Sequence, residues 1–297
     1  MSLENVREKL MEKKLTTLEY FGVAFEAFKG FWKENPVMMV SMFVFMVVSI
    51  VIGIVHSELN EEFLVYYGAN EIMILWAKIF NVLNAVASTV SFFVTAYFFR
   101  KVALTIEGNG KNMKLKELFF KTLILSVIIF VAGIIGNKME NSIIGSIFLI
   151  IFSIVVLCVA LWAFWYFEAY YIRNFGLMES IDYSLELSDG NRIRKFLPGF
   201  FIALGVLIFI IMTRIFFNVL NIENFAAGLI IAFVFVMIFS LLALYSQILN
   251  TVIFLNVEYD YLGKNLNEEL KFGSRNISNE NNQILNNDEN KNEADNG

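Results

Sequence analysis

Polar side chains recur at helical spacing inside a long apolar stretch of this sequence. Successive members are three or four residues apart, which places all of them on one face of a helix. Their amides, hydroxyls and one ammonium group donate and accept hydrogen bonds, but they include no nucleophile with an adjacent base. The chemistry that this stripe favours is therefore binding. The stripe comprises Lys78, Asn81, Asn84, Ser88, Ser91 and Thr95.

Polar groups also lie within other apolar segments. Glu168 and Arg214 are costly to place in hydrocarbon, and such residues usually face protein or water. Gln247 and Asn250 belong to the last apolar segment. With the stripe they would form a polar seam that binds a small polar or amphiphilic molecule. Alternatively, these groups hold helices together through hydrogen bonds worth about 0.6 kcal/mol each, while Lys78 and Arg214 extend to the membrane surface.

The sequence carries no enzyme motif and no metal-binding cluster. There is one histidine, His56, and one cysteine, Cys158, so that neither a zinc site nor an internal disulfide is expected. HExxH, GxSxG and phosphate-binding loops are absent from the sequence. We expect a protein that is not an enzyme, with no cofactor, no metal and no nucleic-acid partner.

Composition decides the fold class. Hydrophobic residues make up 58% of the 297-residue chain, and the mean hydropathy is +0.63. A soluble domain could not bury the apolar surface that this composition implies. Continuous apolar runs are long enough to cross about 30 Å of hydrocarbon, whereas barrel strands would alternate. The sequence predicts an all-α membrane bundle of six transmembrane helices, at about 37–55, 72–99, 119–136, 143–172, 196–220 and 225–257.

Amphipathic segments precede two of the predicted spans. Residues 1–36 are predicted to form an N-terminal amphipathic helix with an aromatic stripe. Residues 179–201 contain a second predicted amphipathic helix, which Gly190 ends. We expect both to lie in the membrane interface, or alternatively to dock a soluble partner. Three basic residues after Gly190 suit anionic lipid headgroups: Arg192, Arg194 and Lys195. The aromatic stripe comprises Phe21, Phe25, Phe28 and Trp32.

Lysine and arginine are distributed unevenly between the predicted loops. Most of them lie in residues 1–36, in the second and fourth loops and after the sixth span, whereas the opposite loops are acidic. The positive-inside rule therefore predicts that both termini are cytoplasmic. We expect the protein to lie in a bacterial inner membrane. The tail, residues 263–297, is rich in Asn, Glu and Lys and is expected to be disordered.

One run of the chain carries a family resemblance. The run "EAYYIRNFGLMESIDYSLELSDGNRIRKFLPGFFIALG" and the closing "NTVIFLNVEYDYLG" resemble poorly characterised bacterial six-span integral membrane proteins. That family is related to the membrane domain of some glycerophosphoryl diester phosphodiesterases. Ser184, Gly190, Asn191 and Lys195 occupy positions of its pattern, but no large catalytic domain follows the last span. The resemblance implies a six-span fold and a membrane location.

These observations give two hypotheses for function. The leading one is a non-enzymatic membrane-embedded scaffold or partner subunit that contacts membrane lipids and a protein partner or a second copy of itself. The alternative is a component of a transporter for a small solute or a lipid. The predicted domain organisation is an N-terminal helix at 1–36, a six-span domain at 37–262 and a tail at 263–297.

Overall fold

The computed structural model describes residues 3–58, 70–109, 115–139, 151, 154, 164–220 and 231–263. Within this part of the chain the secondary structure is helical, without a strand. The predicted all-α class is therefore confirmed. The predicted tail from residue 264 onward lies outside the described residues.

The N-terminal region contains two helices where the sequence pattern predicted one. Helix α1 (Leu3–Glu12) ends before a short connection, and α2 (Thr17–Glu34) begins after it. A capping box separates them: Thr16 Oγ1 accepts from the backbone N–H of Glu19, and the Glu19 carboxylate accepts from the backbone N–H of Thr16. This pair satisfies N–H groups that the first turn of α2 leaves without helical partners.

The aromatic stripe of α2 is partly buried, since Phe21, Phe28 and Trp32 pack against the core. Phe25, a member of that stripe, is half exposed. The buried face is built mainly from small residues, which let α2 approach its neighbours closely, and from two large rings. Its members are Tyr20, Val23, Ala24, Ala27, Gly30 and Phe31.

Among the described residues, four helices are long and apolar enough to cross a membrane, which supports the predicted membrane-helix character and is consistent with a multi-pass membrane protein. They coincide with the predicted first, second, fifth and sixth spans. Helix α6 (Leu115–Met139) covers the predicted third span, and the predicted fourth lies outside the described residues except for α8 (Tyr166–Ile172) and a few others. The four are α3 (Pro36–Glu58), α5 (Glu71–Ile106), α10 (Arg192–Leu220) and the C-terminal helix (Ile231–Gly263).

The two prolines of the chain occupy different helical positions. Pro36 is the first residue of α3, where a missing N–H is without cost. Pro198 lies inside α10, because that helix begins at Arg192, earlier than the predicted span. Its ring leaves the carbonyl of Arg194 without its usual helical donor.

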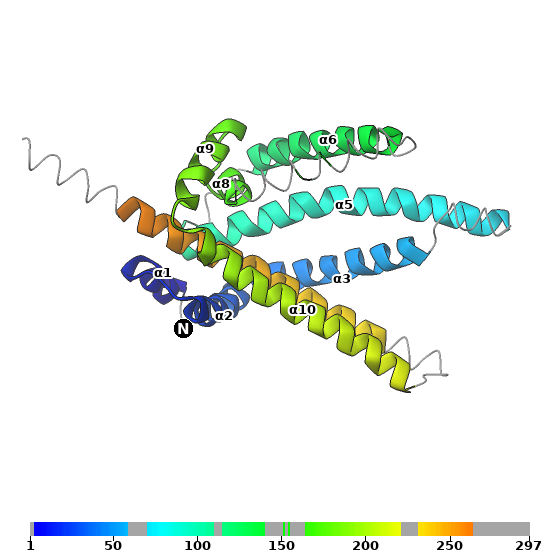
Figure 1. Ribbon diagram of the computed structural model, residues 1–297, viewed down its shortest axis with the longest axis horizontal. Helices are drawn as coiled ribbons and strands as arrows, with labels where there is room; N and C mark the ends of the chain where they lie inside the picture. The colour runs from blue at the N-terminus through cyan, green and yellow to red at the C-terminus, as the bar shows by residue number, and fades with distance from the viewer. Residues whose placement is uncertain are drawn as a thin grey trace, which may run out of the picture.

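The long helices diverge from a compact cluster at one end of the molecule (Figure 1). Helices α3, α5 and α6 extend from the cluster on one side, with α5 in contact with both neighbours. Helix α10 and the C-terminal helix extend together in the same general direction but diverge from these three, toward the lower right of Figure 1, and the Phe209 ring contacts Phe235 and Phe239. We call the cluster the platform: α1, α2, α8 and α9 (Leu177–Ser188) with the adjoining ends of α5, α10 and the C-terminal helix.

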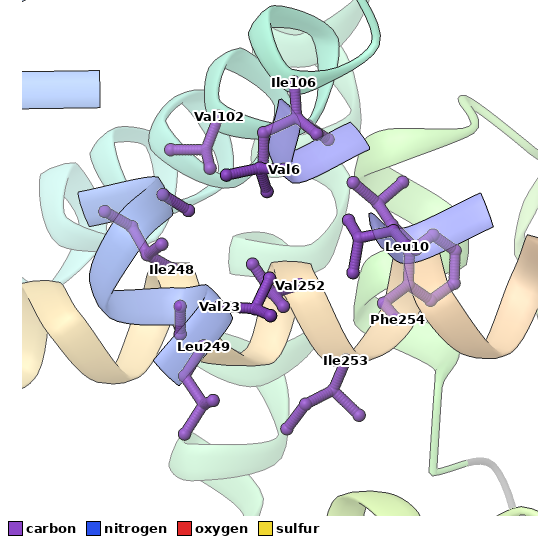
Figure 2. Close-up of a cluster of buried hydrophobic side chains, with 14 of the residues drawn as sticks. Val6, Leu10, Val23, Val102, Ile106, Ile248, Leu249, Val252, Ile253 and Phe254 are labelled. Carbon is purple, nitrogen blue, oxygen red and sulfur yellow. The ribbon is translucent and has the colours of Figure 1, made fainter. Parts of the chain in front are cut away.

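The core of the protein lies in the platform (Figure 2). The C-terminal helix runs through it and is buried on every side, since Val252, Ile253, Phe254 and Leu255 all have zero exposure. Burying one such side chain stabilises a fold by about 1.5–3 kcal/mol. Away from the platform the spans present apolar side chains outward, as a surface in contact with lipid would. Residues of α1, α2 and α5 that complete the core include Val6, Leu10, Val23, Val102 and Ile106.

Helix α9 ends where the sequence predicts. Gly190 has a φ of +68°, a left-handed conformation that glycine adopts without steric cost. The helix buries a serine face, Ser180, Ser184 and Ser188, each with zero exposure. Met178, near the start of the helix, is 76% exposed. Small serine side chains allow α9 to lie close to α8, and Leu187 of the same helix is buried in the core with zero exposure.

Candidate functional site

Polar residues predicted from widely separated segments line one pocket of about 610 Å³ beside the platform. Asn84 and Ser88 come from α5, Glu168 from α8 and Asn250 from the C-terminal helix. Lys195 of α10, predicted as a headgroup contact, lines the same pocket. Ser91 and Thr95 continue the stripe along the wall, and the rest of the lining is largely apolar: Ala87, Phe92, Ala96, Phe99, Phe167 and Tyr171, with Ser49 from α3.

A buried ion pair stands in the wall of this pocket. Lys195 Nζ lies 2.7 Å from Glu168 Oε1 and donates also to the carbonyl oxygen of Phe164 at 2.5 Å. The side chains are 15% and 5% exposed. The ammonium also lies 4.7 Å from the centroid of the Trp165 ring, a favourable position for a cation.

The second oxygen of the same carboxylate has no hydrogen-bond partner in the part of the chain that the structure describes. Glu168 Oε2 is buried and unpaired there, although Oε1 is held by Lys195. A buried charged oxygen without a donor is costly. Glu168 lines the pocket, so that a bound molecule whose donor reaches this buried oxygen would satisfy it.

The remaining predicted binding residues lie away from the pocket wall. Lys78 is exposed and Asn81 partly buried on α5, nearer the end remote from the platform. Gln247 is on the C-terminal helix, where its side-chain oxygen is buried without a hydrogen-bond partner among the described residues. The side chain of Arg214 lies outside the described residues.

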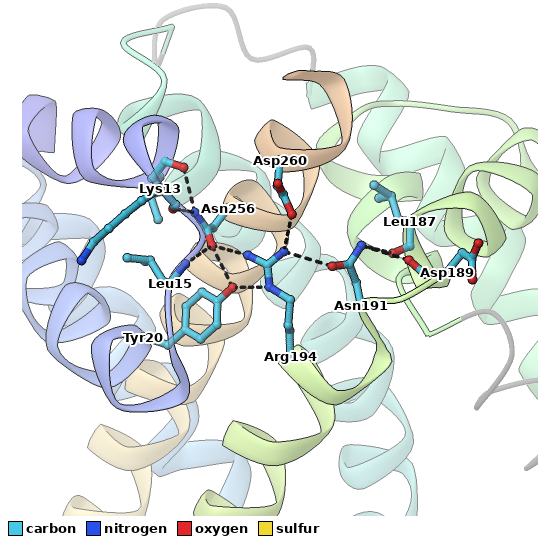
Figure 3. A network of polar contacts seen from close by, with 10 residues as sticks. Lys13, Leu15, Tyr20, Leu187, Asp189, Asn191, Arg194, Asn256 and Asp260 are labelled. Atoms are coloured by element: carbon cyan, nitrogen blue, oxygen red, sulfur yellow. Dashed lines mark hydrogen bonds and ion pairs between the residues drawn. The ribbon is translucent and has the colours of Figure 1, made fainter. Parts of the chain in front are cut away.

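Arg194 lies at the centre of a buried hydrogen-bond network (Figure 3). Its guanidinium donates to Tyr20 Oη at 2.9 Å and to Asn256 Oδ1 at 2.5 Å. It also donates to Asp260 Oδ2 and to Asn191 Oδ1, each at 3.0 Å. The residue is only 8% exposed. The planar fork of donors in arginine suits such a multiple contact, and here it joins α2, α10 and the C-terminal helix.

Asn256 extends this network to the connection between α1 and α2. Its Nδ2 donates to the backbone carbonyls of Leu10 and Lys13, at 2.8 and 2.9 Å. Its Oδ1 accepts from the backbone N–H of Leu15 at 3.2 Å and from Tyr20 Oη at 2.8 Å. The Asn256 side chain thus supplies hydrogen-bond partners to backbone groups at the turn between α1 and α2, because a buried backbone group needs a partner.

Arg173 forms a second centre in the platform. Its guanidinium pairs with Glu107, at the end of α5, at 2.6 Å, and with Glu258 of the C-terminal helix. Tyr183 of α9 donates to Glu258 at 2.7 Å. Burial by itself would lower the pKa of Arg173, but the hydrogen bonds that it donates to Glu258 and Glu107 raise this pKa above its ordinary value. The cation is therefore permanently charged and links three helices.

The turn before α9 is held by basic residues from two other helices. Lys121 of α6 donates to the backbone carbonyls of Phe175 and Tyr170, at 2.5 and 3.3 Å. Arg100 of α5 donates to Asn174, which in turn donates to Glu117 of α6. Asn174 has a φ of +64°, a conformation that asparagine tolerates better than most residues.

The three basic residues predicted to contact lipid headgroups occupy different surroundings. Arg192 is exposed at the first position of α10. Arg194 is engaged in the network of Figure 3, and Lys195 pairs with Glu168 in the pocket wall. The sequence did not predict the roles of Arg173, Tyr20 and Asn256. For Arg173, the position of a single arginine directly after an aromatic helix end could have indicated its role.

The described residues contain no group of three or more histidine, cysteine, aspartate or glutamate side chains that could hold a metal. Compared with known proteins, the chain shows no significant match to a family model, a curated protein or a solved structure.

Proposed function

We propose that this protein is a non-enzymatic scaffold or partner subunit of a bacterial inner membrane, with both termini and the platform on the cytoplasmic side. The observation that carries the proposal is the pair of arginine centres in the platform. Arg194 and Arg173 each join helices that are far apart in the chain. The platform is thereby a fixed body at one end of the spans.

A fixed platform favours a scaffold over a moving device. Removing one partner from a buried ion pair costs about 3–5 kcal/mol, so that rearranging these contacts during a cycle would be expensive. Alternating access requires one group of helices to rock against another, and Arg194 and Arg173 tie together α2, α5, α8, α10 and the C-terminal helix.

The outer side of the platform supports the proposed contact with lipid. Arg192 is exposed, and Ile193 and Phe196 beside it are 73% and 55% exposed. Met178 on α9 adds a further exposed apolar side chain. Apolar residues next to a cation suit the boundary between headgroups and acyl chains. The excess of lysine and arginine on the segments at this end supports the cytoplasmic orientation.

Native mass spectrometry of the protein extracted with its surrounding membrane tests the proposal. A scaffold or partner subunit should emerge with a second chain, or a second copy, at fixed stoichiometry. The variant Lys29→Glu/Lys33→Glu reverses exposed charges of α2 and should release a partner held at the platform, while the melting temperature stays unchanged. A population that is monomeric at every protein concentration would contradict the proposal.

A second candidate function is favoured by the pocket beside the platform. The seam residues Asn84, Ser88 and Asn250 meet there with Glu168 and Lys195, as a component of a small-solute or lipid-related transporter would require. Counterflow of a labelled solute or lipid into proteoliposomes would favour this candidate. A tightly associated partner without counterflow would favour the scaffold.

A further inference from the structure

The pocket beside the platform presents two opposite charges within one buried pair. Glu168 keeps one unpaired oxygen, Oε2, in the part of the chain that the structure describes. Lys195 Nζ has three protons, and its contacts with Glu168 and Phe164 use two of them. The pair thus retains both an acceptor and a donor, so that a ligand with a cation and an anion is complementary to it.

The rest of the pocket is suited to an amphiphile. Its apolar walls include Phe92, Phe99 and Phe167. The hydroxyl and amide groups of Ser88, Ser91 and Asn250 lie on the same lining. A volume of about 610 Å³ is in the range of about 300–1,000 Å³ that holds a molecule of small-ligand size. That is enough for a polar head and the first part of a chain.

The position of the pocket gives such a ligand a source. The pocket is lined by residues of the spanning helices α3, α5 and the C-terminal helix, together with Lys195 of α10, and membrane lipid surrounds the spans. A lipid can therefore place its head at Lys195 and Glu168 while its chains remain beside the apolar spans.

We propose that this pocket binds the head of a membrane phospholipid that carries a primary ammonium group and a phosphate. The ammonium donates to Glu168 Oε2, and the phosphate accepts from Lys195. A quaternary ammonium has no N–H to donate and leaves the carboxylate oxygen unsatisfied. A purely anionic head places a second negative charge beside Glu168. The proposal concerns only the occupant of the pocket and is independent of the scaffold role.

Competitive lipid retention tests the proposal. The full chain is placed in nanodiscs made from equal parts of phosphatidylethanolamine, phosphatidylcholine and phosphatidylglycerol, then washed in mild detergent, and the retained lipid is quantified by mass spectrometry. We expect phosphatidylethanolamine to be retained about tenfold over phosphatidylcholine, a ratio equivalent to about 1.4 kcal/mol. Equal retention of the two, or preferential retention of phosphatidylglycerol, would overturn the proposal.

Variants locate the effect in the pocket. Glu168→Gln removes the charge that selects an ammonium and should bring the ratio close to one, whereas Glu34→Gln, on an exposed carboxylate outside the pocket, should leave it unchanged. Ser91→Leu fills the pocket without touching the ion pair and should reduce retention of every lipid to the background. This second variant keeps the test valid if Glu168→Gln fails to fold. A preference that survives in folded Ser91→Leu protein would refute the site.

Discussion

Arg194 and Asn256 face one another across the junction between α10 and the C-terminal helix, with Nη2 2.5 Å from Oδ1 (Figure 3). Both residues are buried, with Arg194 8% exposed and Asn256 1% exposed. The contact joins a residue at the start of one spanning helix to one near the end of another. It also explains why a basic residue next to a predicted membrane surface is buried in protein.

The first prediction concerns this contact. Arg194→Met should lower the free energy of unfolding by about 3 kcal/mol, at the low end for a broken buried ion pair, because Asp260 is 20% exposed and keeps some access to water. The matched change Arg192→Met, on an exposed side chain, should alter stability by less than about 0.5 kcal/mol. Thermal unfolding in detergent measures both. Equal, small effects would show that the network contributes little.

Tyr20 makes the same network sensitive to alkaline pH. Burial raises its pKa to about 12, against an opposing effect of Arg194. Since the folded-state pKa lies above the unfolded value of about 10, the stability that Tyr20 contributes is fully present below pH 10 and is lost as the pH rises toward 12. We expect a decline in the melting temperature of the wild type over this interval.

Tyr20→Phe is the control for that dependence. At pH 8 the variant should lose about 1–3 kcal/mol, because Arg194 Nε keeps no acceptor for its buried N–H. The difference between wild type and variant should then shrink as the pH rises from 10 to 12. A constant difference over this interval would mean that Tyr20 does not titrate with the folded state.

The polar stripe illustrates what local spacing predicts well. Asn84 and Ser88 lie one turn apart on one helix, so that their common face follows from helical geometry alone. Glu168 and Asn250 were identified as polar groups in apolar segments, and the fold brings them to the same pocket. Periodicity gives the face of each helix, whereas the meeting of the faces depends on packing between helices.

The helix boundary at Thr16 has a local signature in the sequence. Thr16 followed by Glu19 matches the capping-box pattern, and it would have divided the N-terminal region into two helices. The aromatic stripe begins only at Phe21, beyond this boundary, and therefore does not mark it. Small residues such as Ala24 and Ala27 form the buried face, since they allow α2 to pack closely.

Arg194 and the C-terminal helix show the limit of the sequence. A helix that is apolar on all sides has the same composition whether protein or lipid surrounds it, so that the complete burial of Ile253 and Phe254 had no local signature. Likewise, a basic residue before a span suits a lipid headgroup as well as a buried network. For Arg194, the approach of Tyr20 and Asn256 from distant parts of the chain decides between a headgroup contact and a buried network. No local pattern in the sequence predicts that approach.

A third prediction tests the orientation of the chain. In a Cys158→Ala background, a cysteine at Glu71, exposed at the first position of α5, should react with an impermeant thiol reagent in intact cells. A cysteine at the exposed residue Asp189 should react only after the cells are opened, because α9 lies on the cytoplasmic side in the proposed topology. Labelling of Asp189→Cys from outside would reverse the orientation.

The last prediction separates a binding role of the α5 stripe from a purely structural one. Asn84 and Ser88 line the pocket from α5, at positions where leucine suits hydrocarbon at least as well as the polar side chain. If the stripe serves a ligand, Asn84→Leu/Ser88→Leu should retain or gain thermal stability and lose retained lipid. If the stripe joins helices, each lost hydrogen bond should cost about 0.6 kcal/mol and lipid retention should follow the amount of folded protein. Thr89→Leu is the matched control, because Thr89 lies on α5 outside this pocket and its hydroxyl donates to the carbonyl of Ala85 within the same helix. We expect the double variant to differ from this control in lipid retention and to match it in melting temperature; the reverse result would assign the stripe to helix packing.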